Sequence, residues 1–370
     1  MTEETSNKQA AAPLFEPFQI KDLHLENRTV MAPMTRGFSP GGVPNEDVVA
    51  YYRRRAENNV GLIVTEGTGI NHPASVEDPG VPAFYGEKAL EGWEKVVEAV
   101  HEAGGKIIPQ LWHVGMTRPV GAEPNSEAMP IGPSGLALSG EAVSTPLTVE
   151  EIEELVQAYA DAAAAAKRIG FDGIEIHGAH GYLIDQFFWE QTNKRTDQYG
   201  GDFVERTRFA VEVIEACRQA VGEDFPIFFR FSQWKMSDFE AKLADTADEL
   251  AQFLEPLSKA GVDVFHCSTR RFWEPEFDGS SLNLAGWTKY LTGKPSVTVG
   301  SVGLNGVFTS FEKAENDDIQ ELVNRLENDE FDLVAVGRPL LTDPAWAKKM
   351  QEGRTEDLVP FTKDALSELY

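Results

Sequence analysis

Eight short apolar runs, each followed by a stretch with helical spacing, constrain the fold of this chain more than any other feature. The runs are five or six residues long and almost continuously apolar, which is typical of parallel strands buried on both faces. Eight such alternations without an obvious linker predict an α/β fold, a single (β/α)8 TIM barrel rather than a doubly wound sheet. The runs occupy residues 29–34, 61–65, 106–111, 173–177, 226–231, 262–267, 296–300 and 333–337.

Helix signals separate these runs. Residues 148–151 (Thr-Val-Glu-Glu) form a capping-box pattern, in which the first and last side chains satisfy backbone N–H groups at a helix start. Helices are also expected over about residues 87–103 and 204–221. The Asp-Pro pair at 343–344 predicts the start of the last helix, because a cap residue there precedes a proline suited to the first turn.

Several segments lie outside the alternation. The polar and acidic residues 1–13 predict a flexible tail, and residues 14–370 are expected to form one barrel domain. Residues 15–27 predict a short hairpin that caps the bottom of the barrel. Long loops over 114–146 and 268–282 follow the third and sixth strands, at the barrel end where enzymes place their sites. These loops are expected to be lids or binding walls, with surface padding as the alternative.

The charge balance excludes some classes of partner. The chain has 33 Lys and Arg against 60 Asp and Glu, a net charge of −27. So acidic a surface repels nucleic acid and anionic lipid, although a few Arg and N–H groups could still hold one anionic ligand. The two cysteines are too few for a disulfide framework or a four-thiolate metal site, and no signal peptide or membrane-spanning run is evident. A cytoplasmic protein is therefore expected.

The densest group of reactive side chains follows the fourth apolar run. His177, His180 and Tyr182 emerge together at the end of that strand, among glycines that permit tight turns. Two imidazoles can donate hydrogen bonds to one oxygen, and a phenol can deliver a proton. Two alternatives remain, a structural pair satisfied by backbone groups and a metal site. Alternation points Glu175 away from the histidines, so no metal is expected. Rossmann, P-loop and serine-hydrolase motifs are absent.

This segment also resembles a known family. The residues His-Gly-Ala-His-Gly-Tyr-Leu-Ile-Asp-Gln-Phe-Phe at 177–188, with 192–201 and 205–209, are similar to the signature of the old yellow enzyme family of FMN-dependent ene-reductases. Further matches fall in register at six other strands, and together they cover about residues 14–352. They lie at residues 31–36, 64–67, 109–115, 229–232, 298–301 and 336–344.

The resemblance implies a barrel that holds FMN non-covalently at its C-terminal mouth. One set of residues would line or contact the flavin ring, a second would hydrogen-bond its pyrimidine edge, and a third would hold the phosphate. The third set lies in the loops after strands seven and eight, where barrels commonly bind phosphate. The residues of the ring set are Pro33, Met34, Thr35 and Gly67. The pyrimidine-edge set is Gln110 and Arg230, and the phosphate set is Gly300, Ser301, Gly337 and Arg338.

The resemblance also implies a ping-pong reaction. NADPH or NADH would deliver hydride to flavin N5, and the flavin would pass it to the β-carbon of an alkene conjugated to a carbonyl or nitro group. His177 and His180 would bind the oxygen of that group, and Tyr182 would protonate the α-carbon. Trp112, Phe272 and Trp273 are candidate walls of the substrate pocket, with core packing as the alternative for Trp112.

The chain departs from the family pattern at three places. Many members have Asn at the position of His180, and some have Cys at the position of Thr35. Some relatives insert a C-terminal arginine into a neighbouring subunit, but here the last arginine is Arg354 and the chain ends at Tyr370. A monomer, a homodimer and a homotetramer therefore all stay open.

The leading hypothesis is a reductase of small activated alkenes. The alternatives are a flavin-dependent oxidative N-demethylase, a dienoyl-CoA reductase and a flavin-binding redox sensor without turnover. The longer members of the first two classes carry an iron–sulfur site, for which two cysteines are too few.

Overall fold

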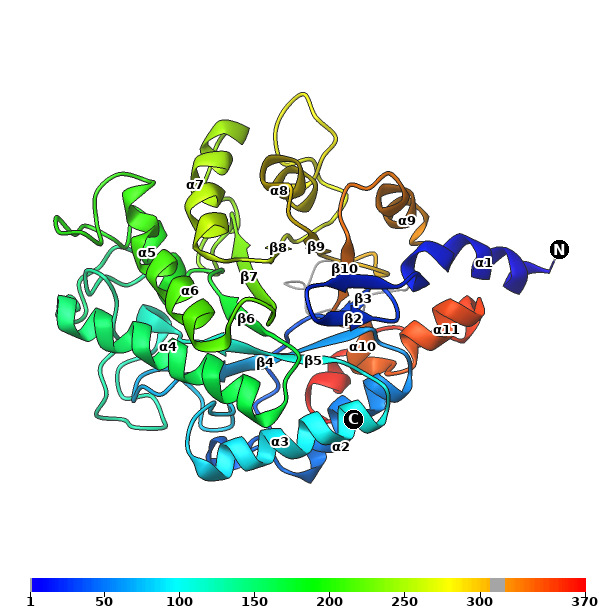
Figure 1. Cartoon of the computed structure of the whole chain (residues 1–370), viewed down its shortest axis with the longest axis horizontal. Coiled ribbons are helices and arrows are strands. Elements are labelled where there is room, and N and C mark those ends of the chain that lie inside the picture. The colour runs from blue at the N-terminus through cyan, green and yellow to red at the C-terminus, as the bar shows by residue number, and fades with distance from the viewer. Residues whose placement is uncertain (1, 307–316) are drawn as a thin grey trace.

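Eight parallel strands form a closed barrel in the computed structural model, which describes residues 2–306 and 317–370 (Figure 1). The strands follow one another around the barrel in chain order, and β10 closes it by pairing with β3 and β9. Each predicted apolar run lies on one of them, so the predicted TIM barrel is confirmed. The strands are β3 (Thr29–Met31), β4 (Leu62–Gly69), β5 (Ile107–Trp112), β6 (Ile174–His177), β7 (Ile227–Ser232), β8 (Val264–Ser268), β9 (Ser296–Val299) and β10 (Leu333–Val336).

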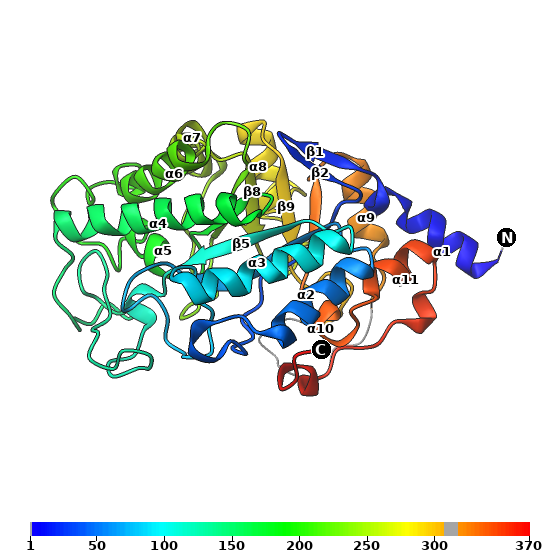
Figure 2. The same ribbon diagram turned by 60° about the horizontal axis from the view of Figure 1, so that its bottom comes forward.

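Helices connect successive strands and surround the barrel (Figure 2). The predicted capping box is present at α4, where Thr148 and Glu151 bond each other's backbone N–H groups. The main helices are α2 (Glu46–Glu57), α3 (Glu87–Glu102), α4 (Val149–Ile169), α5 (Leu183–Phe188), α6 (Arg208–Val221), α7 (Ala247–Ala260), α8 (Leu284–Thr292), α9 (Gln320–Glu327), α10 (Pro339–Thr342) and α11 (Trp346–Glu352).

The predicted start of the last helix needs correction. Asp343 is the C-cap of α10, and α11 begins only at Trp346. The carboxylate of Asp343 accepts a hydrogen bond from the backbone N–H of Ala345 and pairs with Lys349 at 2.8 Å. Through these contacts Asp343 joins the two short helices, and Pro344 lies in the turn between them.

The N-terminal hairpin closes the bottom of the barrel, as predicted. Strands β1 (Phe18–Ile20) and β2 (Leu23–Leu25) pair antiparallel. Leu23 and Leu25 are buried in one cluster with the residues that fill the barrel interior. Between the strands, Lys21 pairs with Asp263 at 2.9 Å, which fastens the hairpin to the N-terminal end of β8.

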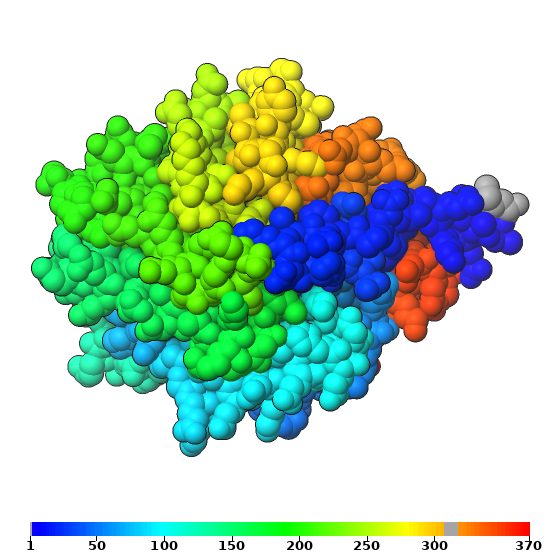
Figure 3. Space-filling view, in the orientation of Figure 1, coloured from blue at the N-terminus to red at the C-terminus, as the bar shows by residue number. Residues whose placement is uncertain are grey.

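The prediction of a flexible tail before this hairpin was wrong for most of the segment. Residues 3–11 form helix α1 (Glu3–Ala11), which lies against α11 (Figure 3). The Nδ2 atom of Asn7 donates to Thr355 Oγ1 at 2.9 Å, and Ala11 is buried. Contacts with the end of the chain therefore hold a helix whose own sequence has a weak apolar face.

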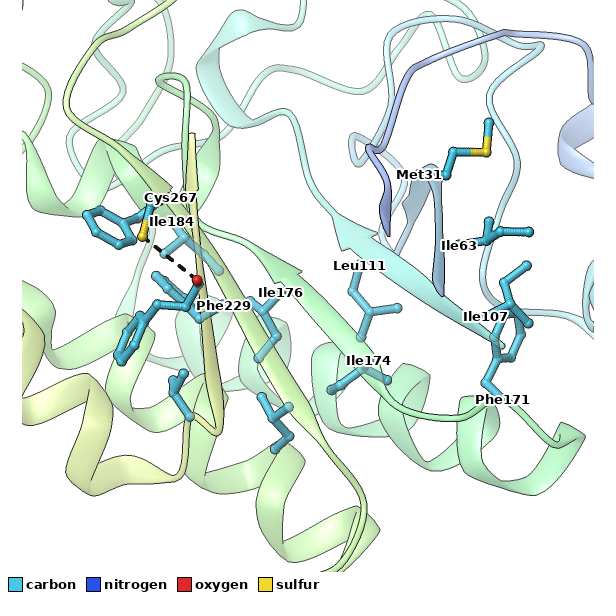
Figure 4. Packing of buried hydrophobic residues seen from close by; sticks show 14 of the residues in the cluster. Met31, Ile63, Ile107, Leu111, Phe171, Ile174, Ile176, Ile184, Phe229 and Cys267 are labelled. Atoms are coloured by element: carbon cyan, nitrogen blue, oxygen red, sulfur yellow. Dashed lines mark hydrogen bonds between the residues drawn. The ribbon is translucent and has the colours of Figure 1, made fainter. Parts of the chain in front are cut away.

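Two apolar layers enclose the strands. Outward-facing side chains pack against the helices, as Figure 4 shows for Ile174, Ile176 and Phe229. Inward-facing side chains fill the barrel, among them Phe228. Because side chains alternate along a strand, Arg230 shares the inner face with Phe228. This alternation brings a charged side chain into the barrel near the C-terminal end of β7.

The predicted long loops follow β5 and β8. In the first loop, Arg118 is buried and donates to five backbone carbonyl groups, including Val76 O at 2.9 Å.

Across the described part of the chain, no helix is both long and apolar enough to cross a membrane.

Candidate active site

A cavity of about 290 Å³ opens at the C-terminal ends of the barrel strands. Its walls come from the ends of β3, β6, β7, β8, β9 and β10 and the segments that follow them, so it lies where barrel enzymes carry their sites. The structure brings nine of the predicted site residues together in these walls. They are Pro33, Met34, Thr35, His180, Arg230, Gly300, Ser301, Gly337 and Arg338.

Arg230 supplies a fixed positive charge to this cavity. Burial lowers the pKa of its guanidinium to about 10, which leaves it charged at neutral pH. Its Nη2 atom donates weakly to Ser268 Oγ at 3.4 Å, and its buried Nε atom has no hydrogen-bond partner in the described chain. A buried N–H group without a partner is rare and indicates that a ligand atom completes it. The arginine therefore suits an electron-rich ligand edge.

The charge of Arg230 is balanced from inside the barrel. Glu175 Oε2 lies 2.8 Å from His266 Nδ1, and Glu175 Oε1 accepts a hydrogen bond from Gln110 Nε2 at 3.0 Å. Burial alone would raise the pKa of Glu175, but His266 and Arg230 hold it below its ordinary value. The amide nitrogen of Gln110 thus hydrogen-bonds Glu175, and Gln110 does not line the cavity.

The loops after β9 and β10 form a second polar end of the cavity. Gly300 has φ +133°, and a Cβ atom there would lie 2.6 Å from the carbonyl oxygen of Thr269, so the position requires glycine. Arg338 donates through Nη2 to Gly306 O, while its buried Nη1 lacks a partner among the described residues. A forked cation with a free donor and an adjacent glycine turn suit an anionic group such as a phosphate.

His177, His180 and Tyr182 form an aromatic group beside the cavity, and of these three only His180 lines it. His177 ends β6, and Tyr182 is the N-cap of α5. The two imidazole rings lie 5.1 Å apart, and the phenol ring lies 5.1 Å from His177 and 6.4 Å from His180, all between centroids. Trp112 stacks on His177 at 6.0 Å and meets Tyr182 edge-on at 5.1 Å. Trp112 is therefore part of this aromatic group.

The protonation states of this group follow from its surroundings. Burial, and then the charge of Arg230, hold the pKa values of His177 and His180 well below the ordinary histidine value, so both rings are neutral. The backbone N–H of Ala179 donates to His177 Nδ1 at 3.2 Å, so the single ring proton of His177 is on Nε2. Burial, with a smaller contribution from Glu77, raises the pKa of Tyr182 to about 12 and keeps it a phenol.

Several contacts fix His180 in the cavity wall. Its Nε2 atom lies 2.7 Å from Ser268 Oγ, and its backbone N–H donates to Ser232 Oγ at 2.9 Å. Trp234 stacks on the imidazole with 4.3 Å between ring centroids and an interplanar angle of 23°. The backbone of His180 is left-handed, with φ +65°, which is uncommon for a residue that has a Cβ atom.

The structure does not bring every predicted residue to the cavity. Gly67 pairs with Gln110 in the sheet, and a Cβ atom there would lie 2.4 Å from the Trp112 ring. Phe272 is buried in the outer core, and Trp273 packs against that core. Neither aromatic residue lines the cavity, because the backbone of Phe272 bonds Gly300 O and directs the loop outward toward α8.

Other residues that sequence reasoning missed complete the walls. Ser268 is the last residue of β8 and Trp234 follows the end of β7, and that position was the available signal for both. Phe361 and Leu366 come from the C-terminal segment, for which the sequence carried no signal. In the described chain, no group of three or more His, Cys, Asp or Glu could hold a metal ion. The added lining residues include Trp234, Met236, Ser268, Thr269, Arg270, Phe361 and Leu366.

Comparisons with known proteins agree with this architecture. Residues 13–357 match the model of the NADH:flavin oxidoreductase / NADH oxidase family. A flavin oxidoreductase of Emericella nidulans is 35% identical over 364 residues, which cover 92% of this chain and 91% of the relative. An NADH oxidase of Thermoanaerobacter brockii is 36% identical over 93% of this chain, and 12-oxophytodienoate reductase 7 of rice is 43% identical over 59% of it.

The chain spans only part of some relatives. It covers 52% of the length of the Thermoanaerobacter NADH oxidase and 58% of the length of the rice reductase. Among solved structures, morphinone reductase in complex with tetrahydroNAD superimposes with a TM-score of 0.79 and 30% identity, covering 95% of this chain and 93% of that chain. The similarity thus extends over almost the whole barrel.

Proposed function

The chain belongs to the NADH:flavin oxidoreductase / NADH oxidase family, and from this membership we propose that it reduces the C=C bond of activated alkenes at the expense of NADPH or NADH. FMN is the cofactor of the family. The substrates proposed are α,β-unsaturated carbonyl and nitro compounds. The observation that carries the proposal is the grouping of His177, His180 and Tyr182 beside the cavity that contains Arg230.

The cavity residues fit FMN. Two arginines at different sides of the cavity, Arg230 and Arg338, have buried donor atoms without partners in the described chain. We assign Arg230 to the electron-rich edge of the ring system and Arg338, with Gly300, Ser301 and Gly337, to the phosphate. Pro33, Met34 and Thr35 would then line the ring. FMN, when bound, supplies the hydride that the alkene accepts.

The two histidines would bind the oxygen of the substrate's electron-withdrawing group. A neutral ring whose proton is on Nε2, as in His177, donates a hydrogen bond without bringing a full charge. Such donors stabilise the negative charge that develops on the oxygen as the alkene is reduced. Arg230 already lies close to these two rings, and protonation of either ring would place a second buried positive charge beside it at considerable cost.

Tyr182 would hold the proton that the α-carbon receives. Its raised pKa keeps the proton on the phenol oxygen throughout the physiological pH range. Trp112 contacts both Tyr182 and His177 and so would fix the angle between proton donor and oxygen site. The buried surroundings limit competition from solvent protons.

Anaerobic turnover tests this proposal directly. The purified protein should bind FMN, oxidise NADPH or NADH in the presence of 2-cyclohexenone or a nitroalkene, and form the saturated product. N-methyl amines, offered as substrates to the oxidised protein, should leave its flavin oxidised. Demethylation without enone reduction would favour an amine demethylase, and flavin colour without turnover of either substrate class would favour a sensor. Folded protein that refuses FMN would contradict the cofactor assignment.

A further inference from the structure

A buried ion pair joins the turn that carries His180 and Tyr182 to the loop after β7. Lys235 Nζ lies 2.6 Å from Asp185 Oδ1, and both side chains are fully buried. Asp185 lies in helix α5, directly after the turn, and Lys235 follows the end of β7. Transfer of two charges from water to the interior is costly, and apolar replacements often stabilise a fold equally well. The location of this pair beside the site therefore indicates a role besides stability.

The carboxylate of Asp185 also holds the turn itself. Its Oδ2 atom accepts a hydrogen bond from the backbone N–H of Gly181 at 2.8 Å. His180 and Gly181 have φ +65° and +83°, so two consecutive residues adopt the left-handed conformation. That conformation is unfavourable for a residue with a Cβ atom, such as His180. The bond from Asp185 thus stabilises a backbone geometry that the turn alone would disfavour.

Lys235 lies in the loop that covers His180 from the other side. The preceding residue, Trp234, stacks on the His180 ring, and the following residue, Met236, donates its backbone N–H to His180 O at 3.1 Å. Both of these neighbours line the cavity, whereas Asp185 and Lys235 do not. The ion pair therefore acts on the cavity only through the residues that it holds.

We propose that Asp185 and Lys235 form a positioning pair that fixes His180 and Tyr182 against the loop after β7. The proposal rests on the oxygen-binding and proton-donating roles proposed above for those two side chains. Through the Gly181 N–H bond, Asp185 sets where the ring of His180 and the phenol of Tyr182 lie. Lys235 keeps that carboxylate ionised and draws Trp234 onto His180. The pair thereby determines how tightly the site binds the substrate oxygen.

Paired substitutions separate positioning from stability. The single variants D185N and K235M each leave one uncompensated buried group and should be destabilised. The double variant D185L/K235M removes both charges and should recover a melting temperature near that of the parent, but it leaves the Gly181 N–H without an acceptor. We expect it to bind phenol, an analogue of the substrate oxygen, at least tenfold more weakly while retaining FMN. D185N/K235M, which keeps an acceptor for Gly181, should recover part of that affinity.

Nuclear magnetic resonance gives a readout that does not depend on turnover. The Gly181 amide signal and the ring nitrogens of His180 should shift in D185L/K235M and return toward parent values in D185N/K235M. Arg218→Met is the matched control, because it breaks a buried ion pair with Asp263 at the opposite end of the barrel. It should lower the melting temperature and leave phenol affinity and both signals unchanged.

Two results would overturn the positioning role. One is a folded D185L/K235M that binds phenol within twofold of the parent with unchanged Gly181 and His180 signals. The other is a loss of phenol affinity that follows the loss of stability in every variant, Arg218→Met included. If D185L/K235M does not fold, D185N must still weaken phenol binding and shift the Gly181 signal, and unchanged values refute the proposal. A parent protein without enone turnover would refute the proposed function instead, while the signals would still decide the positioning.

Discussion

The phenol ring of Tyr182 stands perpendicular to the imidazole ring of His177, with 89° between the planes and 5.1 Å between the centroids. The two rings come from different elements, the start of α5 and the end of β6. Trp112, from the end of β5, contacts both. The proposed proton donor and an oxygen-binding group are therefore packed as one rigid corner of the site, and each can be removed separately.

Replacement of Tyr182 by Phe tests the proton donor. The variant keeps the ring packing against Trp112 and His177 but loses the hydroxyl group. Reduction of the bound flavin by NADPH should be unchanged, whereas its reoxidation by 2-cyclohexenone should slow by about 10²–10⁴-fold, the usual contribution of a general acid. Anaerobic stopped-flow measurement of both half-reactions checks this. Equal reoxidation rates in parent and variant would assign the proton to another group.

The protonation state of the two histidines predicts how phenol affinity depends on pH. Both pKa values lie well below the ordinary histidine value because of burial and Arg230, so neither ring titrates near pH 6.5. Affinity for a phenol that itself stays neutral should remain level from about pH 5.5 to 8. An imidazolium requirement would instead weaken binding about tenfold for each pH unit above the pKa. Calorimetric titration distinguishes the two.

Truncation of the same histidines tests their contact with the ligand. His177→Ala/His180→Ala should weaken phenol binding strongly, since two donors are lost from one buried site. His101→Ala is the control, because His101 is bonded to Asp172 on the outer surface of the barrel. Unaltered phenol affinity in the double variant would place the oxygen site elsewhere.

Ser268 links His180 to Arg230 and should affect how tightly the site binds phenol. Its hydroxyl oxygen lies 2.7 Å from His180 Nε2 and 3.4 Å from Arg230 Nη2. Ser268→Ala should lower phenol affinity by roughly 2- to 10-fold, the effect of one buried hydrogen bond. Ser268→Thr keeps the hydroxyl group and should retain most of the affinity. Equal losses in both variants would indicate a steric rather than a hydrogen-bonding role.

Arg338 should contribute to cofactor affinity. The Arg338→Met variant loses the buried donor that has no partner in the described chain. A hydrogen bond to a charged group contributes about 1.5–3 kcal/mol, so FMN should bind roughly 10- to 150-fold more weakly. Riboflavin, which lacks the phosphate, should be affected far less. Fluorescence titration of both flavins measures the difference, and equal losses for both would remove Arg338 from the phosphate site.

Glu66 links stability to pH beside the Thr35 loop. Its carboxylate is buried and accepts N–H bonds from Arg36 and Gly37, and burial raises its pKa to about 7. The folded state therefore binds this proton more tightly than the unfolded state, so stability falls as pH rises from about 4.5 to 7. Relative to Glu66→Gln, the parent should lose up to about 3 kcal/mol across that range.

Chemical denaturation at pH 5 and pH 8 measures this difference. The stability of Glu66→Gln minus that of the parent should be larger at pH 8 than at pH 5. Glu98→Gln, at an exposed position on α3, serves as the control and should show no such change. A difference that is constant with pH would mean that Glu66 does not take up a proton in this range.

The barrel was predictable because its strands are buried on both faces. Runs such as Leu-Val-Ala-Val at 333–336 are apolar on both faces, and the Thr148–Glu151 capping box marked α4 locally. Helix α1 was missed because long-range contacts, such as Asn7 with Thr355, stabilise it. A single sequence shows polarity, but it does not show which distant segment will cover a weak helix.

A place at the cavity was predictable where motifs sit at strand ends, as at Arg230. The aromatic residues were harder, because a loop residue after a strand can turn inward or outward: Trp234 lines the cavity, whereas Phe272 is buried in the outer core. The C-terminal wall depends on contacts across most of the chain. Arg36 donates to the carbonyl groups of Ala365 and Glu368 and so holds that segment beside the cavity.

A single-turnover experiment separates reduction of the alkene from reduction of the flavin. Protein with its flavin reduced by one equivalent of NADPH, under nitrogen, is mixed with 2-cyclohexenone, and flavin absorbance and product are followed together. We expect prompt reoxidation with one cyclohexanone formed per flavin, and a much slower reaction in Tyr182→Phe. Flavin that stays reduced until oxygen is admitted, with no cyclohexanone formed, would contradict the proposed reduction of activated alkenes.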